Sequence, residues 1–191
     1  MNTVAIIQAR MNSTRLPGKV LMDIKGKPML QHIVDRARAS NVDNVVVATN
    51  DISPEIVDYC NNHGIPSYEA DDETLNRYLL TALKFDASPI VRLWGDCPLV
   101  IPKDINTTLK LYDHTSFQYI YHERHIGVFS LNSLNNWSDE IEDEKDREDF
   151  HLYLLEHKNG EVCHIGRSLP FKDSVDTMED LEFIRGIYEL L

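Results

Sequence analysis

The sequence has few cysteines and no long apolar segment. Its three cysteines, Cys60, Cys97 and Cys163, lie far apart and form no CxxC pair, which argues against a disulfide framework and a structural zinc site. The apolar run near the N-terminus, residues 4–7, is too short for a signal peptide or a membrane span. We therefore expect a soluble, cytoplasmic protein that does not act at a membrane.

Two common phosphate-binding signatures are also missing. No glycine precedes Gly18 at the spacing of a Walker loop, and Val20 stands where that loop needs serine or threonine after Lys19. The sequence contains no GxGxxG dinucleotide fingerprint either. These absences disfavour a P-loop ATPase or kinase and the simplest kind of dehydrogenase.

Positive charge is scarce, and it is concentrated. The 191 residues carry 31 acidic and 19 basic side chains, and the net charge of −12 opposes attraction to nucleic acid or an anionic membrane. Residues 1–38 nevertheless contain seven basic and two acidic side chains, a local charge of +5. Such a basic stretch suits a small polyanion such as a nucleotide, although a solvated surface gives the same pattern.

Short apolar, β-branched runs alternate with amphipathic segments along the whole chain. We predict helices from about residues 28, 54 and 103, a further helix over 75–82, a last one opening at 177, and strands at 4–8, 45–48, 89–93, 117–121 and 126–130. This alternation predicts an α/β fold, a mainly parallel sheet with helices on both faces. The chain length fits one domain over residues 1–191.

A polar segment, QARMNSTRLPGK, follows the first predicted strand directly. It therefore emerges at the edge where open α/β sheets bind ligands. Its three cations, Arg10, Arg15 and Lys19, can surround a triphosphate. Small residues such as Ser13 and Gly18 let backbone N–H groups approach phosphate oxygens.

Two aspartates are predicted to reach the same edge. Asp96 follows a strand in the turn WGDCP, and Asp176 lies just before a helix N-cap at Thr177. Mg²⁺ is commonly held by one or two carboxylates together with phosphate oxygens and water, so this pair is a candidate metal clamp. Taken singly, Asp96 could be a turn residue and Asp176 a helix-cap neighbour.

Five segments occur in an order that resembles one protein family. They are QARMNSTRLPGKVL, IKGKPML, VVVATN, VRLWGDCPL and SVDTMEDLEFIRGIYE. Together they resemble the motifs of cytidylyltransferases that activate sugar acids, such as the 3-deoxy-manno-octulosonate and acylneuraminate enzymes, and most of all the spore-coat polysaccharide type. The resemblance implies a Rossmann-like, glycosyltransferase-A-like nucleotidyltransferase fold, Mg²⁺ as cofactor, and transfer of CMP from CTP to a small sugar acid.

The resemblance also implies roles for single residues. It gives the catalytic roles to Lys19, Arg15 and Asp96, and we expect Lys19 and Asp96 to be exposed at a polar site. Four side chains would hold the triphosphate and two the metal. The triphosphate residues are Arg10, Ser13, Arg15 and Lys19, and the metal ligands are Asp96 and Asp176.

Two further segments are similar to family motifs. Residues 70–78 resemble the segment that borders the nucleobase pocket, so Arg77 is a candidate contact to CTP, although a surface helix arginine fits the sequence equally well. Asp146, Arg147 and Glu148 resemble a motif near the sugar site, but they lie in an acidic run that a solvated helix explains more simply.

The link between the strands predicted at 117–121 and 126–130 departs from the family pattern. Family members usually carry a longer segment there, which helps form the sugar pocket and often a dimer contact, whereas this chain has only HERH. A homodimer is therefore one expectation among others. Two alternatives stay open: a nucleotidyltransferase of the same fold with another nucleotide or acceptor, and a shortened relative that binds nucleotide without catalysis.

Overall fold

The central feature of the computed structural model, which describes residues 2–70, 73–167 and 169–191, is a seven-stranded sheet. The strand order is β5-β4-β1-β6-β8-β7-β9, and within the described residues only β8 runs antiparallel to its neighbours in this sheet. The predicted, mainly parallel sheet is thereby confirmed. The strands are β1 (Val4–Gln8), β4 (Asn44–Asn50), β5 (Ser67–Ala70), β6 (Ile90–Trp94), β7 (Tyr119–His122), β8 (Ile126–Phe129) and β9 (Val162–Ile165).

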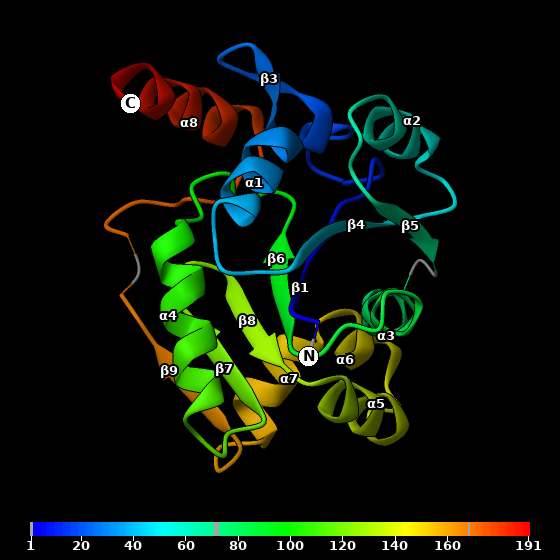
Figure 1. The fold of residues 1–191 in the computed structure, drawn as a ribbon. Coiled ribbons are helices and arrows are strands. Elements are labelled where there is room, and N and C mark those ends of the chain that lie inside the picture. The colour runs from blue at the N-terminus through cyan, green and yellow to red at the C-terminus, as the bar shows by residue number, and fades with distance from the viewer. Residues whose placement is uncertain (1, 71–72, 168) are drawn as a thin grey trace.

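Helices cover both faces of the sheet (Figure 1). Successive side chains of a strand point to opposite faces, so Ala5 and Ile7 join one buried cluster while Val4 and Ile6 join the other. The first cluster packs against α1 (Met29–Arg38), α2 (Pro54–Asn62), α4 (Pro102–Asp113) and α8 (Met178–Leu190), and the second against α3 (Thr74–Lys84), α5 (Leu131–Glu140) and α7 (Phe150–His157). Across the described chain, no helix combines the length and apolar character needed to cross a bilayer.

Short elements fill the connections. A 3₁₀ turn, η1 (Lys19–Leu21), precedes a two-stranded ribbon of β2 (Asp23–Ile24) and β3 (Lys27–Pro28), and α6 (Glu144–Glu148) precedes α7. The sequence pattern did not predict this ribbon, nor α5 and β9. Helix α5 is mostly polar, with only Leu134 and Trp137 as buried apolar residues, and β9 has no fully buried residue. Neither segment therefore shows a clear hydrophobic periodicity in the sequence.

The hairpin predicted at HERH is confirmed. Strands β7 and β8 pair antiparallel from Tyr119 with Phe129 to His122 with Ile126. The turn occupies residues 123–125. His122 is 6% exposed, because its ring packs beside Gly166 and its Nδ1 accepts a hydrogen bond from the Arg124 amide. The link is therefore less solvated than a polar sequence predicts.

Candidate functional site

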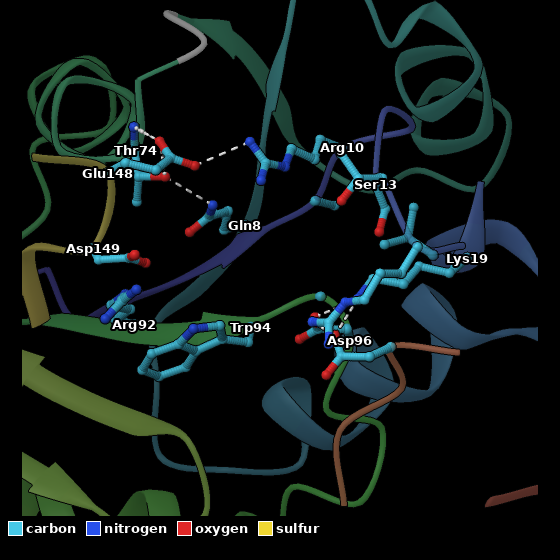
Figure 2. A pocket seen from close by; sticks show the side chains of 16 residues that line it. Gln8, Arg10, Ser13, Lys19, Thr74, Arg92, Trp94, Asp96, Glu148 and Asp149 are labelled. Atoms are coloured by element: carbon cyan, nitrogen blue, oxygen red, sulfur yellow. Dashed lines mark hydrogen bonds and ion pairs between the residues drawn. The ribbon is translucent and has the colours of Figure 1, made fainter. Parts of the chain in front are cut away.

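A polar cavity of about 290 Å³ opens at the carboxyl ends of β1 and β6 (Figure 2). This is the edge where open α/β sheets bind ligands. Its walls come from segments far apart in the sequence, including the loop after β1, the end of β6 and the start of α3. The structure brings together six sequence-predicted residues here: Arg10, Ser13, Arg15, Lys19, Asp96 and Asp176.

The loop after β1 is fixed at both ends by hydrogen bonds. The Met11 amide donates to Ser53 Oγ at 3.0 Å, and the Gly18 amide donates to the Met11 carbonyl at 2.8 Å. Gly18 has a φ of 73°, a left-handed conformation that glycine adopts without a steric penalty. The chain then turns into η1, which points Lys19 back into the site.

The turn after β6 approaches β1 closely. The Gly95 amide donates to the Gln8 carbonyl at 2.8 Å, and a Cβ at this position would lie 2.4 Å from the same oxygen. Only glycine fits this contact. The contact between Gly95 and Gln8 places Asp96 beside the loop that carries Lys19. The Val175 amide then donates to the Asp96 carbonyl at 2.8 Å, which brings Asp176 to the same place.

Lys19 lies between the two aspartates. Its Nζ is 2.7 Å from Asp96 Oδ2, 3.2 Å from Asp176 Oδ1 and 2.6 Å from the Val175 carbonyl oxygen. These three acceptors match the three protons of an ammonium group. The residue is only 7% exposed, so the expectation of an exposed Lys19 is wrong: its charge is buried against the groups that it pairs.

Asp176 is surrounded by cations. Besides Lys19, Arg15 Nη2 lies 2.8 Å and Lys172 Nζ 2.9 Å from its carboxylate oxygens. Burial opposes ionisation of this carboxyl, but the hydrogen bonds and charges of Lys172 and Lys19 outweigh it and hold the pKa of Asp176 below its usual value. The predicted helix start follows directly, with Thr177 and Asp180 forming a reciprocal capping box.

Glu148 spans the opposite wall of the cavity. Its Oε1 lies 3.0 Å from Arg10 Nη1, and its Oε2 accepts from the amide and the hydroxyl of Thr74 at 3.0 and 2.8 Å. Arg147 has a different role, because its Nε binds Glu73 Oε2 at 2.6 Å and its Nη1 donates to two carbonyls that end α5. Of the three residues 146–148, only Glu148 lines the cavity.

Arg77 occupies neither position expected for it. It is fully buried on α3, it is absent from the cavity walls, and its Nη2 donates to Thr74 Oγ1 at 3.1 Å. It is thus neither a direct cavity residue nor a surface arginine. The amphipathic pattern of α3 gave no sign of a buried arginine; residues 71 and 72, in the same family-like segment, lie outside the described residues.

The family follows from a comparison of the whole chain. Residues 4–180 match the family model described as cytidylyltransferase. The chain belongs to the cytidylyltransferase family. The resemblance carried by the five ordered segments is therefore confirmed.

Curated relatives of the chain are named as octulosonate cytidylyltransferases or as a protein of spore coat polysaccharide biosynthesis. The 3-deoxy-manno-octulosonate cytidylyltransferase of Trichlorobacter lovleyi is 38% identical over 58% of this chain, but the alignment spans only 44% of that protein. The spore coat polysaccharide biosynthesis protein SpsF of Bacillus subtilis is 30% identical, with 96% of this chain and 85% of that protein covered. The chain thus spans less than half of the first of these relatives and most of the second.

Solved structures support the fold. A cytidylyltransferase from Leptospira borgpetersenii has a TM-score of 0.91 at 24% identity, covering 100% of this chain and 88% of that one. A CMP:2-keto-3-deoxy-manno-octonic acid synthetase in complex with CTP gives 0.82 at 24%, covering 100% and 99%. A manganese complex from Mycobacterium tuberculosis gives 0.72 at 18%, covering 97% and 99%. The expected nucleotidyltransferase fold is confirmed.

The carboxylates of the cavity suit a divalent metal that also binds a ligand. Two carboxylate oxygens, from Asp96 and Asp176, converge on one cation, the ammonium group of Lys19. Among the described residues, no group of three or more His, Cys, Asp or Glu side chains could hold a metal ion alone. Two carboxylates with phosphate oxygens and water are a donor set that Mg²⁺ prefers.

The other end of the cavity contains residues that sequence reasoning missed. Arg92 and Trp94 lie on the same face of β6 and line the cavity, and the Arg92 guanidinium carbon is 3.8 Å from the Trp94 ring centroid. The rings of His125 and His151 meet Trp94 edge-on at 5.6 and 5.2 Å. The available signal was an arginine within IVRLW, an otherwise apolar buried strand.

Proposed function

We propose that this cytidylyltransferase transfers CMP from CTP to a hydroxyl group of a sugar acid and releases pyrophosphate, with Mg²⁺ as the metal. The observation that carries the proposal is the convergence of Asp96 and Asp176 on Lys19 beside a basic loop. The names of the relatives, which act on octulosonates, agree with a sugar-acid acceptor. The solved neighbours with CTP and with manganese agree with the donor and with a divalent metal.

Arg10 and Arg15 would neutralise the triphosphate. Their side chains are 39% and 64% exposed, and each pairs with a carboxylate near the surface, so each can turn toward phosphate oxygens without exposing a buried charge. Ser13 lies between them on the cavity wall. Displacement at the α-phosphorus needs this neutralisation because charge grows on the departing pyrophosphate.

Lys19 would act mainly by positioning. Since its three protons already bind Asp96, Asp176 and the Val175 carbonyl, it holds two like-charged carboxylates at one point. Those carboxylates would hold the metal, which when bound supplies positive charge to the phosphate oxygens and orients them. The acceptor hydroxyl would attack in line with the leaving pyrophosphate, without a covalent enzyme intermediate.

Thermal unfolding with each of CTP, UTP, ATP and GTP, with and without Mg²⁺, tests the proposal without knowledge of the acceptor. A nucleotide at one hundred times its dissociation constant adds about 2.7 kcal/mol, which shifts the midpoint by several degrees for a domain of this size. We expect the largest shift with CTP and Mg²⁺. In Asp96→Asn, the Mg²⁺-dependent part of the shift should disappear.

The matched control is Asp35→Asn. Asp35 lies on α1, outside the cavity walls, and its exposed carboxylate pairs with Lys27. This variant should keep the full shift. A shift with a nucleotide other than CTP would favour a nucleotidyltransferase of different specificity. The absence of any nucleotide shift would contradict the proposal and favour a relative without catalytic function.

A further inference from the structure

Arg92 is a charged residue in the interior of β6. It is 2% exposed, and its guanidinium carbon lies 3.8 Å from the ring centroid of Trp94, 4.6 Å from Phe150 and 5.4 Å from Tyr78. These rings attract a cation through their π faces. The ring faces themselves do not accept the planar hydrogen bonds that a guanidinium group offers.

Two of the three nitrogens of the Arg92 guanidinium group lack hydrogen-bond partners among the described residues. Its Nε and Nη1 are sealed from solvent and have no hydrogen-bond partner, and no carboxylate in the described ranges forms an ion pair with it. Asp149 lines the same cavity, and Figure 2 shows it above the guanidinium group without a bond between them. An uncompensated buried charge costs free energy, so such a group is usually paired or awaits a ligand.

Two further polar atoms near Arg92 also lack hydrogen-bond partners. His151 Nδ1 and Tyr119 Oη are also buried without a hydrogen-bond partner within the described residues. Burial, with the charges of Arg92 and His125, lowers the pKa of His151 to about 2, so its ring is neutral and its Nδ1 donates or accepts one hydrogen bond according to the tautomer. Arg92 and the Trp94 ring therefore line the end of the cavity away from Lys19, and the His151 imidazole packs against that ring.

The four basic side chains of the cavity differ in their pairing. Arg10, Arg15 and Lys19 each bind at least one carboxylate, whereas Arg92 binds none in the described part of the chain. We propose that Arg92 binds the carboxylate of the acceptor and thereby makes an acidic sugar the preferred substrate. The inference rests on the proposed function, which it extends from a substrate class to the residue that recognises it.

The position of Arg92 favours the acceptor over the nucleotide. Cytosine is neutral and needs no buried cation, and the triphosphate residues gather around Lys19 and Asp96, at the opposite end of the view in Figure 2. Trp94 separates the two ends, and an aromatic face is a common platform for the apolar side of a sugar ring. A planar guanidinium group can hold a carboxylate through two parallel hydrogen bonds.

Calorimetric titration of the full chain provides the test. The probes are 3-deoxy-manno-octulosonate, an acylneuraminate, and the methyl ester of each, which lacks the negative charge. The wild type should bind at least one acid about 10- to 100-fold more tightly than its ester, the range expected for hydrogen bonds to a charged group. In Arg92→Met this ratio should fall to near one, while the affinity for CTP stays unchanged.

Two further variants sharpen the test. Arg92→Lys keeps the charge but not the planar fork, so it should restore part of the preference. Arg185→Met removes an arginine of α8 that pairs with Glu182 outside the cavity, and it should leave the ratio as in the wild type. A melting curve for each variant shows whether it folds, and Arg92→Lys supplies the answer if Arg92→Met does not.

Three results would overturn the inference. An undiminished preference for the acid in both Arg92 variants would leave the proposed function standing but remove Arg92 from it. A loss of CTP affinity in both variants would assign Arg92 to the nucleotide. If the wild type binds neither acid more tightly than its ester, the protein has no carboxylate subsite for these probes. The shifts in unfolding temperature with nucleotides then test the proposed function separately.

Discussion

The two ends of the cavity hold buried cations in opposite states. Lys19 has an acceptor for each of its protons, two of them carboxylate oxygens. Arg92 is even less exposed, and two of its nitrogens have no acceptor in the described structure. One end is therefore electrostatically complete before any ligand arrives, and the other end is not.

This difference separates two uses of a buried charge. A fully paired lysine draws three segments of the chain together and belongs to the architecture of the site. A buried arginine without an ion-pair partner does not recover the free energy that its desolvation costs. We therefore expect its role to lie in binding a ligand. Changes at the two ends should accordingly affect different measurements.

The largest expected effect is on turnover at the paired end. Asp96→Asn removes a carboxylate of the proposed metal pair and the charge that faces Lys19, so pyrophosphate release should fall by about 100- to 1000-fold. The measurement is the initial rate of pyrophosphate release at saturating CTP with 3-deoxy-manno-octulosonate as the acceptor. Because the Asp96 side chain is 25% exposed, the variant should still fold.

The matched substitution Asp35→Asn should leave the same rate unchanged, since Asp35 lies on α1 outside the cavity walls and pairs with Lys27 and Gln31. An Asp96→Asn variant with a rate near that of the wild type would show that the paired end is structural and that catalysis depends on other groups.

The second effect is on stability. Lys19→Met leaves Asp96 and Asp176 facing each other without the ammonium group between them, and it frees the buried Val175 carbonyl. We expect the free energy of unfolding to fall by about 1–3 kcal/mol, the cost of breaking a largely buried pair. Urea unfolding monitored by circular dichroism measures this change.

Arg92→Met is the contrast. It removes a charge that no carboxylate of the described chain compensates, and the loss of its contacts with Trp94 and Phe150 offsets that gain. The free energy of unfolding should therefore change by less than about 1 kcal/mol. If Arg92→Met destabilises the protein as much as Lys19→Met, the two ends are alike and Arg92 is part of the architecture.

Much of the paired end could be predicted from the sequence. The strands that end at Gln8 and Trp94 are short, mainly apolar runs, and parallel strands that end together bring the residues after them to one edge of the sheet. Asp176 was predictable because a capping box fixes the helix start next to it. The burial of Lys19 was not, because it depends on the Val175 carbonyl, which reaches the site only through the tertiary fold.

Most of the unpaired end could not be predicted from the sequence. Arg92 stands within a strand whose pattern is otherwise apolar, and a pattern gives no account of which charges lack partners. His151 lies on a short helix after an acidic run that a solvated surface explains equally well. The burial of Arg77 was missed for the same reason, since periodicity describes faces and not the side chains that meet there.

The smallest expected effect is a pH dependence at the unpaired end. The pKa of His151 falls from 6.5 to about 2 on folding, because burial and the charges of Arg92 and His125 disfavour the protonated ring. Below pH 6.5 the unfolded chain therefore binds a proton that the folded chain does not, so stability is full above pH 6.5 and declines as the pH falls. His151→Gln removes this contribution to the pH dependence of stability.

Urea unfolding at about pH 7 and about pH 5.5 should thus show that the wild type loses about 1 kcal/mol more than His151→Gln. His157→Gln is the matched control, because His157 lies on the same helix but is exposed and stacks on Tyr153. It should follow the wild type. Equal slopes in all three proteins would mean that His151 carries its proton when folded. Two cations side by side would need a negative charge nearby that compensates them, and the contrast between the two ends would then disappear.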